Sequence, residues 1–401
     1  MQPDGRYLTA KQAADKLGVT LPTLYAYTSR GQLRSERSPG HPRERRYVRE
    51  DVERWQQRKE ARRDPAKAAA GGLHWGSPVL DSNLTLIHDG KLYYRGHDAV
   101  NLARTASLEQ VAMLLWVTDR ESLFDQPCIV PPRLLARLRT AVRDPVTLLQ
   151  VALPAAGAFD LAAYDLRASA VSQTGARIVR LFTSLIAGRY SPAPVHLALQ
   201  AAWARKNEAA GEVIRKALVL CADHELNVSA FTARCAASAA ASPYDAIAAA
   251  LATLKGRKHG AATERVSALF TETEVPKRAR AIIGDRLRRG ESVPGFGHPL
   301  YPAGDPRAAS LLRLVEESGN GSAWQLVRAL RKAGSDLLCD LPNLDFGLAA
   351  LARAYFLPDS APLVLFALGR TVGWIAHLIE QYSTDELIRP RARYTGPAPG
   401  G

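Results

Sequence analysis

Residues 293–307 of the chain read Val-Pro-Gly-Phe-Gly-His-Pro-Leu-Tyr-Pro-Ala-Gly-Asp-Pro-Arg. Proline and glycine interrupt regular structure, so this stretch predicts a turn-rich junction between helices. The junction carries His298, Asp305 and Arg307. Polar groups at helix ends framed by glycine are where backbone N–H groups and side chains converge on a ligand. We therefore take this junction as the first part of a candidate site.

Similar polar junctions recur along the chain. They are Asp-His-Glu-Leu-Asn at 223–227, Lys-Gly-Arg-Lys-His-Gly at 255–260, Pro-Asn-Leu-Asp-Phe at 342–346, Gly-Arg at 369–370 and Arg-Pro-Arg at 389–391. A single histidine beside a glycine is more often a helix cap than a ligand-binding group. Their joint occurrence in one chain favours a shared site.

The sequence between these junctions has helical periodicity. The stretches are 131–149, 170–189, 193–220, 227–241, 244–254, 275–290, 307–318, 322–333, 345–356 and 361–381. Residues 82–94 predict a hairpin that turns at His88-Asp89-Gly90. Strands and helices do not alternate, which argues against a doubly wound sheet. The predicted fold class is mostly α.

Length and composition narrow the class of protein. The 401 residues exceed what one ordinary core fills, and 47% of them are hydrophobic, as in a globular chain. The four cysteines show no Cys-x-x-Cys spacing, which is typical of reduced thiols. The start, MQPDGRYLTA, lacks a signal pattern, and the Ala-rich run 235–254 is broken by Pro243 and Asp245. We expect a soluble, cytoplasmic protein.

The positive charge is unevenly distributed. The net charge is +14, and residues 1–63, with 15 basic and 8 acidic side chains, hold half of it. Such a concentration indicates a polyanionic partner for this segment. A solubilising basic tail is the plainer alternative.

The same segment has the pattern of a helix-turn-helix. A helix is predicted over 11–17 and ends at Gly18, and a second over 23–29 follows Thr20 as its N-cap. An arginine-rich strip and a third short helix, 51–55, come next. Two short helices joined by a Gly-Val-Thr turn are typical of this motif.

Residues 6–60 resemble the winged helix-turn-helix of the MerR and excisionase type. The resemblance rests on Ala-Ala at 13–14, Leu-Gly-Val-Thr at 17–20, Thr-Leu-Tyr at 23–25, Arg-Gly at 30–31 and Arg-Tyr at 46–47. It implies that the second helix enters the major groove of DNA and the wing contacts phosphates. The implied DNA-binding residues are Thr23, Tyr25, Tyr27, Arg34, Arg43, Arg45 and Arg46, with Leu24 in the core. Docking to a protein is the alternative role.

Domain boundaries follow from composition. Residues 1–63 form the predicted helix-turn-helix domain, 64–72 (Asp-Pro-Ala-Lys-Ala-Ala-Ala-Gly-Gly) a linker, and 73–401 the large domain.

Several motifs are excluded: Gly295-Phe296-Gly297 lacks the third glycine of a dinucleotide site, and Val228 stands where a zinc helix needs its second histidine. No metal site is predicted.

About residues 75–396 resemble a citrate synthase. The most specific element is Gly-Phe-Gly-His-Pro-Leu-Tyr…Asp-Pro-Arg-Ala within 295–308. The resemblance implies a mostly α-helical homodimer whose small domain, roughly 260–350, closes over the substrates. It also implies condensation of acetyl-CoA with oxaloacetate and hydrolysis of the thioester, without a cofactor beyond CoA.

The resemblance assigns roles to individual residues. Asp345 matches the base, His259 the donor to the enolate oxygen, and His298 the group that polarises and protonates the ketone. The implied oxaloacetate-binding residues are His224, Arg307, Arg370 and Arg389, the last reaching the neighbouring subunit. The implied CoA-binding loop is Val293, Pro294, Gly295, Phe296 and Gly297.

One segment departs from the family pattern. Where the family usually has Gly-Pro-Leu/Ala-His-Gly-Gly-Ala-Asn, residues 256–263 read Gly-Arg-Lys-His-Gly-Ala-Ala-Thr. Arg257 and Lys258 are candidates for CoA phosphates; the alternatives are another acceptor or a damaged site. We expect these two charges to lower the pKa of His259 and keep it neutral.

Three functions remain open from the sequence. The first is an acyl-CoA condensing enzyme with a fused DNA-binding module, using acetyl-CoA or, as the nearest rival, propionyl-CoA to give 2-methylcitrate. The second is a transcription regulator that uses the synthase fold as a metabolite sensor. The third is an enzyme whose N-terminal module serves only assembly.

Overall fold

The computed structural model describes residues 7–29, 32–38, 41–49, 51–52, 55, 79–126, 129–318, 321–392 and 394–398. The chain divides into an N-terminal unit, residues 1–81, and a C-terminal unit, residues 82–401. Each is described by itself. The predicted linker 64–72 and the closing Gly31 of the second helix lie outside the described residues.

The N-terminal unit pairs a three-stranded antiparallel sheet with short helices. The strands are β1 (Tyr7–Thr9), β2 (Ser35–Ser38) and β3 (His41–Val48), in the order β1-β3-β2. Helix α1 (Ala10–Leu17) begins with a capping box between Thr9 and Gln12 and ends at Gly18 in the left-handed region. Helix α2 (Leu21–Ser29) follows directly after Thr20.

A small apolar core holds this unit together. It consists of Leu8, Ala13, Ala14, Leu17, Leu24, Leu33, Tyr47 and Val52, with Tyr27 and Trp55 packed against it. Leu24 is fully buried, as expected for the inward face of the second helix. The core brings α1, α2 and the sheet together, which is the arrangement predicted for a winged helix-turn-helix.

The C-terminal unit begins with a small sheet of β4 (Thr85–His88), β5 (Lys91–Tyr94) and β6 (His97–Asp98), in that order. The turn between β4 and β5 is Asp89-Gly90, and both residues have positive φ. Such a two-residue turn matches the twist of a hairpin. The predicted hairpin is therefore present, with His88 in the strand.

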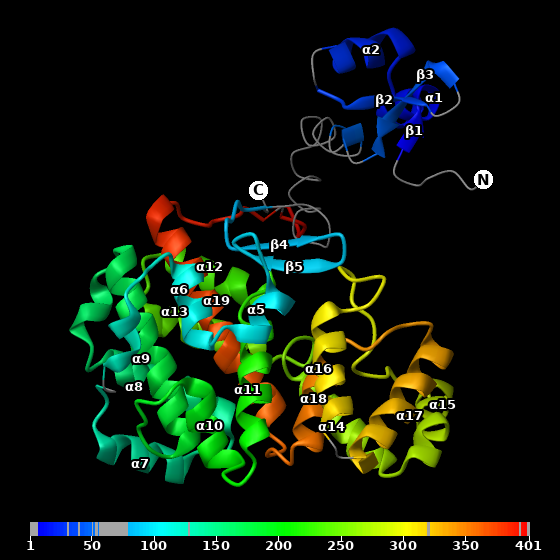
Figure 1. Ribbon diagram of the computed structural model, residues 1–401. Helices are drawn as coiled ribbons and strands as arrows, with labels where there is room; N and C mark the ends of the chain where they lie inside the picture. The colour runs from blue at the N-terminus through cyan, green and yellow to red at the C-terminus, as the bar shows by residue number, and fades with distance from the viewer. Residues whose placement is uncertain are drawn as a thin grey trace. The chain divides into compact units, whose positions relative to one another are not determined.

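Helices make up the rest of this unit (Figure 1). In its first part they are α5 (Ala99–Thr105), α6 (Leu108–Trp116), α7 (Pro132–Ala141), α8 (Pro145–Gly157), α9 (Ala168–Ala187), α10 (Val195–Trp203), α11 (Glu208–Cys221), α12 (Val228–Ser238) and α13 (Pro243–Leu254). They continue with α14 (Ala262–Thr273), α15 (Ala279–Arg288), α16 (Pro306–Glu317), α17 (Gly321–Leu338), α18 (Leu344–Ala354) and α19 (Ala361–Thr384). The mostly α fold class is confirmed.

Two helix groups are visible in Figure 1. Helices α14 to α18 lie together on one side, and α6 to α13 surround α19 on the other. Helices α11 and α16, and α18 and α19, connect the groups. The first group coincides with the segment proposed as the small domain.

Helix α19 forms the centre of the unit. It is long and apolar enough to cross a membrane, but 94% of its apolar window is buried inside the protein. Alpha-helical neighbours α6, α9, α11, α12 and α13 cover it. Such a helix is typical of the core of a large helical protein.

Some predicted helix bounds differ from the structure. The stretch 131–149 is divided at Asp144, which caps α8, and 193–220 is divided between α10 and α11. Helix α14 was missed, because the glycines and charges of 256–260 obscured its apolar face. Proline, capping and loop chemistry outweigh apolar periodicity at these places.

Candidate active site

Asp305 organises the junction before α16. Its carboxylate caps that helix by accepting from the backbone N of Arg307, at 3.0 Å. The same carboxylate holds the Arg307 guanidinium through two bonds of 3.0 and 2.8 Å, and both side chains are buried. Its Oδ2 also accepts from the backbone N of Leu344, at the start of α18. One buried carboxylate thus joins Arg307, a predicted substrate-binding residue, to the helix that carries Asp345.

The glycine-rich loop is fixed by pairing with a distant segment. The backbone N of Gly297 donates to Leu341 O at 2.8 Å, and the N of Asn343 donates to Gly295 O at 2.9 Å. Asn343 then caps α18, where its side chain accepts from the backbone N of Asp345 at 3.1 Å. The pairing places the loop beside the start of α18, within reach of the Asp345 carboxylate.

Asp345 has the properties of a general base. Burial raises its pKa to about 7, and the Asp305 charge adds to this effect, while Arg307 and Arg370 act in the opposite direction. Its Oδ1 is buried and has no hydrogen-bond partner among the described residues. A carboxylate that titrates near neutral pH and keeps an unused lone pair is suited to remove a proton from carbon.

Two histidines meet at the opposite side of the junction. The rings of His224 and His298 are 5.1 Å apart, and the Tyr301 hydroxyl lies 3.0 Å from His224 Nε2. Burial and Arg307 lower the pKa of His298 to about 4, and burial and nearby arginines hold the pKa of His224 well below its usual value. His298 Nδ1 accepts from the backbone N of Leu300, so the neutral ring carries its proton on Nε2.

His259 is held by Ser229 at the start of α12. Its Nε2 lies 2.8 Å from Ser229 Oγ, which also accepts from the indole N–H of Trp374 at 3.1 Å. Asn227 Oδ1 already accepts two backbone N–H groups, those of Ser229 and Ala230. Ser229 Oγ also donates to Asn227 Oδ1 at 2.7 Å, so its contact with His259 Nε2 fixes the place of the ring. The sequence analysis missed Ser229, because its role depends on a contact across 30 residues.

The expected neutral His259 is present, but the expected cause is wrong. Burial lowers its pKa to about 3, and the charge of Arg370 contributes. Arg257 and Lys258 have no part in the shift, because their side chains lie on another side of the 256–260 turn and line a surface hollow. Adjacency in sequence did not give adjacency in space.

Arg370 approaches the site from α19. It is almost fully buried, and its Nε donates to the backbone O of Cys221 at 2.9 Å. Burial lowers its pKa, and the charge of Asp223 works against that effect. Arg370 acts on the titration of His224, His259 and Asp345. One guanidinium therefore lies among the groups predicted to be catalytic.

The structure brings most of the predicted site residues together and leaves others apart. The mutually interacting residues are His224, His259, His298, Arg307, Arg370 and Asp345. Arg389 is exposed on the segment after α19. Phe296, predicted to contact CoA, packs on Phe346 and Gly334 inside the helix group α14–α18. Its ring supports the loop from inside, because an apolar ring gains more from burial than from water.

A basic hollow of about 520 Å³ lies beside the His259 turn. Arg257, Lys258, Arg265 and Ser292 line it, and Arg265 donates to Ser292 Oγ at 2.6 Å. Three cations around one hollow suit an anionic ligand. Arg265 and Ser292 were not predicted, since they come from α14 and from the residue before the glycine-rich loop.

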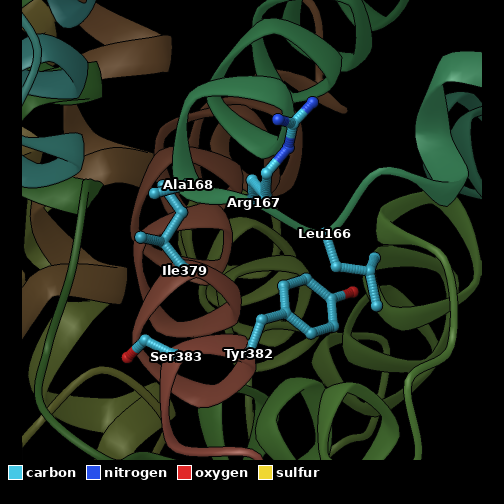
Figure 2. Close-up of a pocket in the computed structure, with 6 residues that line it drawn as sticks. All are labelled: Leu166, Arg167, Ala168, Ile379, Tyr382 and Ser383. Atoms are coloured by element: carbon cyan, nitrogen blue, oxygen red, sulfur yellow. The ribbon is translucent and has the colours of Figure 1, made fainter.

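A second hollow, of about 320 Å³, lies between the start of α9 and the end of α19 (Figure 2). Its lining includes Leu166, Tyr382 and Ser383. Arg167, the cation of this lining, points away from the Tyr382 ring in Figure 2 and is paired with Asp165. The second hollow therefore lacks the three cations of the first hollow.

The predicted DNA-binding residues divide into two sets. Tyr25 and Arg45 are exposed, and Thr23 is half-buried on α2. Tyr27 instead stacks on Trp55 at 4.2 Å.

Two of the predicted arginines have partners inside the N-terminal unit. Arg34 forms two side-chain bonds to Asp51, at 2.8 and 2.9 Å. Arg46 pairs with Glu36 and lies over the Tyr7 ring. The side chain of Arg43 lies outside the described residues. Internal partners reduce what Arg34 and Arg46 offer to a phosphate, because an ion pair must first be broken.

No group of three or more metal-ligating side chains occurs in the described part of the chain. The predicted substrate-binding groups are arginines and histidines, and the predicted base is a carboxylate. This donor set suits carboxylate recognition and proton transfer.

Comparison with known proteins identifies both parts of the chain. The family described as "Citrate synthase, C-terminal domain" matches residues 72–391, and a "Helix-turn-helix domain" matches residues 7–60. Citrate synthase 2 of Bacillus subtilis is 30% identical over 82% of this chain and 96% of that protein. The 2-methylcitrate synthase of Mycobacterium tuberculosis is 32% identical over 76% of this chain and 84% of that protein.

Solved structures agree. The citrate synthase of Thermotoga maritima has a TM-score of 0.71 and 25% identity, covering 82% of this chain and 97% of its own. That of Thermoplasma acidophilum, solved with carboxymethyl coenzyme A and oxaloacetate, has a TM-score of 0.72 and 26% identity, covering 83% and 97%. The chain therefore belongs to the citrate synthase family, as an enzyme of that type joined to a helix-turn-helix domain.

Proposed function

We propose that the C-terminal unit condenses an acyl-CoA with oxaloacetate and hydrolyses the resulting thioester. The observation that carries this proposal is Asp345, a buried carboxylate with a pKa of about 7 and an unpartnered Oδ1. Neutral imidazoles and two guanidinium groups surround it. This set combines a base, donors to developing oxyanions and cations for carboxylates.

The chemistry follows from these groups. Asp345 removes a proton from the carbon next to the thioester carbonyl, and the neutral His259 ring donates to the enolate oxygen that forms. The enolate carbon attacks the ketone of oxaloacetate, and His298 Nε2–H donates to the oxygen that becomes a hydroxyl. The two carboxylates of oxaloacetate raise the pKa of His298, which favours an imidazolium ring that becomes neutral when Nε2 gives up its proton. Water then hydrolyses the thioester, which releases CoA and the tricarboxylate.

Arg307, Arg370 and His224 are proposed to bind the carboxylates of oxaloacetate. Arg389, exposed on the C-terminal segment, is proposed to complete the site of a second copy. We therefore propose a homodimer. Mixing an Arg389→Ala variant with an Asp345→Asn variant is expected to restore part of the activity through mixed dimers, which two independent monomers would not do.

Arg257, Lys258 and Arg265 are proposed to bind the phosphates of CoA at the basic hollow. The double variant Arg257→Ala/Lys258→Ala is expected to raise the KM for acyl-CoA by about a hundredfold or more, because two charged hydrogen bonds of about 1.5–3 kcal/mol each are lost. The KM for oxaloacetate is expected to stay within about twofold, as its arginines lie elsewhere.

Steady-state kinetics with the two substrates varied in turn provide the measurement. Dephospho-CoA thioesters serve as the control ligand, because they lack one phosphate. A rise in the oxaloacetate KM equal to that for acyl-CoA would contradict this placement of CoA.

The proposed activity is tested by the release of CoA from acetyl-CoA and propionyl-CoA with a panel of 2-oxo acids. We expect turnover with oxaloacetate. The choice between acetyl and propionyl thioesters depends on pocket volume, where one methylene is worth about 1–3 kcal/mol. Absence of turnover with every pair, together with tight binding of oxaloacetate, would instead favour a metabolite sensor.

We propose that the N-terminal unit binds double-stranded DNA through α2 and the β2–β3 wing. Support comes from the excess positive charge of residues 1–63, the exposed Tyr25 and Arg45, and the match to a helix-turn-helix domain. Two units in a homodimer would suit a palindromic site. The free thiols Cys221, Cys235 and Cys339 support a cytoplasmic location, which cell fractionation tests.

Arg45→Ala is expected to weaken binding to all DNA sequences and to reduce the slope of log affinity against log salt by about 1, as for one lost phosphate contact. Tyr25→Ala is expected to affect preferred sites more than random DNA, since α2 is the proposed reading helix. Fluorescence anisotropy at several salt concentrations measures both. If the wild type and the variant bind DNA with equal affinities that do not depend on salt, DNA binding through the wing would be excluded. The role in assembly would then remain.

A further inference from the structure

A chain of buried charged groups runs from α19 to the candidate site. Glu380 pairs with Arg234 of α12, and Arg234 Nε donates to His377 Nδ1 at 3.0 Å. His377 Nε2 lies 3.3 Å from Asp223 Oδ1. Asp223 and His377 are fully buried, and Asp223 directly precedes His224. The chemistry proposed above assigns no role to these four residues.

The proton positions in this chain follow from its partners. A guanidinium only donates, so His377 Nδ1 accepts from Arg234 and the neutral ring carries its proton on Nε2, facing Asp223. The Asp223 Oδ2 accepts from Thr85 Oγ1 at 2.5 Å. Oδ1 and Nε2 approach each other without hydrogen-bond alignment, and neither has another partner among the described side chains. Both atoms are therefore able to tighten their contact.

The packing of α19 brings this carboxylate against Arg370. A Cβ on Gly373 would lie 2.4 Å from Asp223 Oδ1 and 2.3 Å from Ala222 O, so only glycine permits the approach. Three residues earlier, Arg370 Nε donates to Cys221 O. The 221–224 turn is thus held at Cys221 by the Arg370 hydrogen bond and at Asp223 by the close packing against Gly373. This turn carries the His224 ring into the site.

Acidic and basic side chains alternate along this series of buried groups, and the alternation affects substrate binding. Burial raises the pKa of Asp223, but His377, Arg370 and Thr85 outweigh that effect and keep it below its usual value. In the empty site Asp223 is the anion that offsets Arg370. When a dicarboxylate takes Arg370, the Asp223 charge repels that ligand unless another donor compensates it. His377 Nε2–H is the donor placed to do so.

We propose that Asp223 and His377 are positioning residues for the dicarboxylate substrate, holding the turn that carries His224 while His377 compensates the Asp223 charge once Arg370 binds the ligand. The inference rests on the proposed function for the identity of that ligand. We propose no contact between these two residues and the substrate, because His224 and Arg370 lie between them and the site.

The test compares His377→Leu, which removes both ring nitrogens, with His377→Gln, whose amide restores a donor towards Asp223. His377→Leu is expected to raise the KM for oxaloacetate by about tenfold or more, the value of one hydrogen bond to a charged group. The KM for acyl-CoA is expected to stay within about twofold, and His377→Gln to recover most of the loss. Leu378→Ala, at an equally buried neighbour, is the control that lowers Tm without changing either KM.

A second measurement does not depend on turnover. In histidine-labelled full-length protein, His377→Leu is expected to shift the His224 ring signals in nitrogen NMR spectra, and His377→Gln to return them. If the wild-type protein neither turns over nor binds oxaloacetate, the proposed function is excluded. The His224 signals would still decide this inference. Unchanged His224 signals, or a His377→Leu variant that differs from wild type only in Tm, would overturn it.

Discussion

Asp345→Asn is expected to lower kcat by about 10²–10⁴-fold, the usual contribution of a positioned general base. Asparagine keeps the size of the side chain but accepts no proton at this pH. The loss arises in the step that forms the enolate, so exchange of the acyl α-protons with solvent should fall in parallel. CoA release and α-proton exchange by NMR are the measurements. A variant that retains exchange would assign the base to another residue.

The same substitution is expected to stabilise the fold above neutral pH. The folded-state pKa of Asp345, about 7, lies above its usual value of 3.8, so the folded state binds this proton more tightly. Ionisation therefore costs stability as pH rises between these two values, by roughly 2–4 kcal/mol in total. Asp345→Asn removes that cost, and its gain in Tm should be larger at pH 8 than at pH 5. Equal gains at both values would show that burial does not set the pKa.

The pH profile of wild-type activity provides the control for both results. Since Asp345 works ionised, kcat/KM for acyl-CoA should increase with pH through about 7 and fall about tenfold per unit below it.

Arg370→Met is expected to raise the KM for oxaloacetate by about a hundredfold, equivalent to about 3 kcal/mol for a lost charge-assisted pair. The KM for acyl-CoA should change little. Arg370 has no directly bonded carboxylate, but its charge offsets that of the buried Asp223, so we expect its removal to lower the stability of the empty protein less than removal of Arg307 does. Urea unfolding and steady-state kinetics measure the two effects separately.

Arg307→Met is the matched comparison, and the expected outcome differs. Arg307 is bonded twice to the buried Asp305, which also accepts from Leu344 N. Its removal leaves an uncompensated buried carboxylate, which costs about 3–5 kcal/mol of stability. We therefore expect loss of stability and of kcat together, because α18 carries Asp345. Identical stability of the two variants would contradict this division of roles.

Several features were readable from the sequence because they depend on local chemistry. Thr20 and Gly18 set the ends of α1 and α2, and Asp89-Gly90 forms the predicted turn. The glycine-proline junctions marked His298 and Arg307, and the family resemblance extended these to Asp345. Caps, turns and prolines act over a few residues, so a linear reading reaches them.

Other features depended on contacts across the fold. Arg34 and Arg46 looked like a phosphate-binding set, but Asp51 and Glu36 pair with them. Ser229 holds the His259 ring in place, although nothing near His259 in the sequence indicates this contact. The neutral state of His259 was predicted for the wrong reason, because burial exceeds the effect of adjacent charges.

From the sequence alone, the turn residues and most helices follow from residue type and short spacing, and the proposed acid, base and cationic groups follow from the family resemblance. Only the tertiary structure decided which atoms are available and in which protonation state. The physical reason is that desolvation and hydrogen-bond partners come from segments far apart in the chain, as Asp223, His377 and Arg370 illustrate.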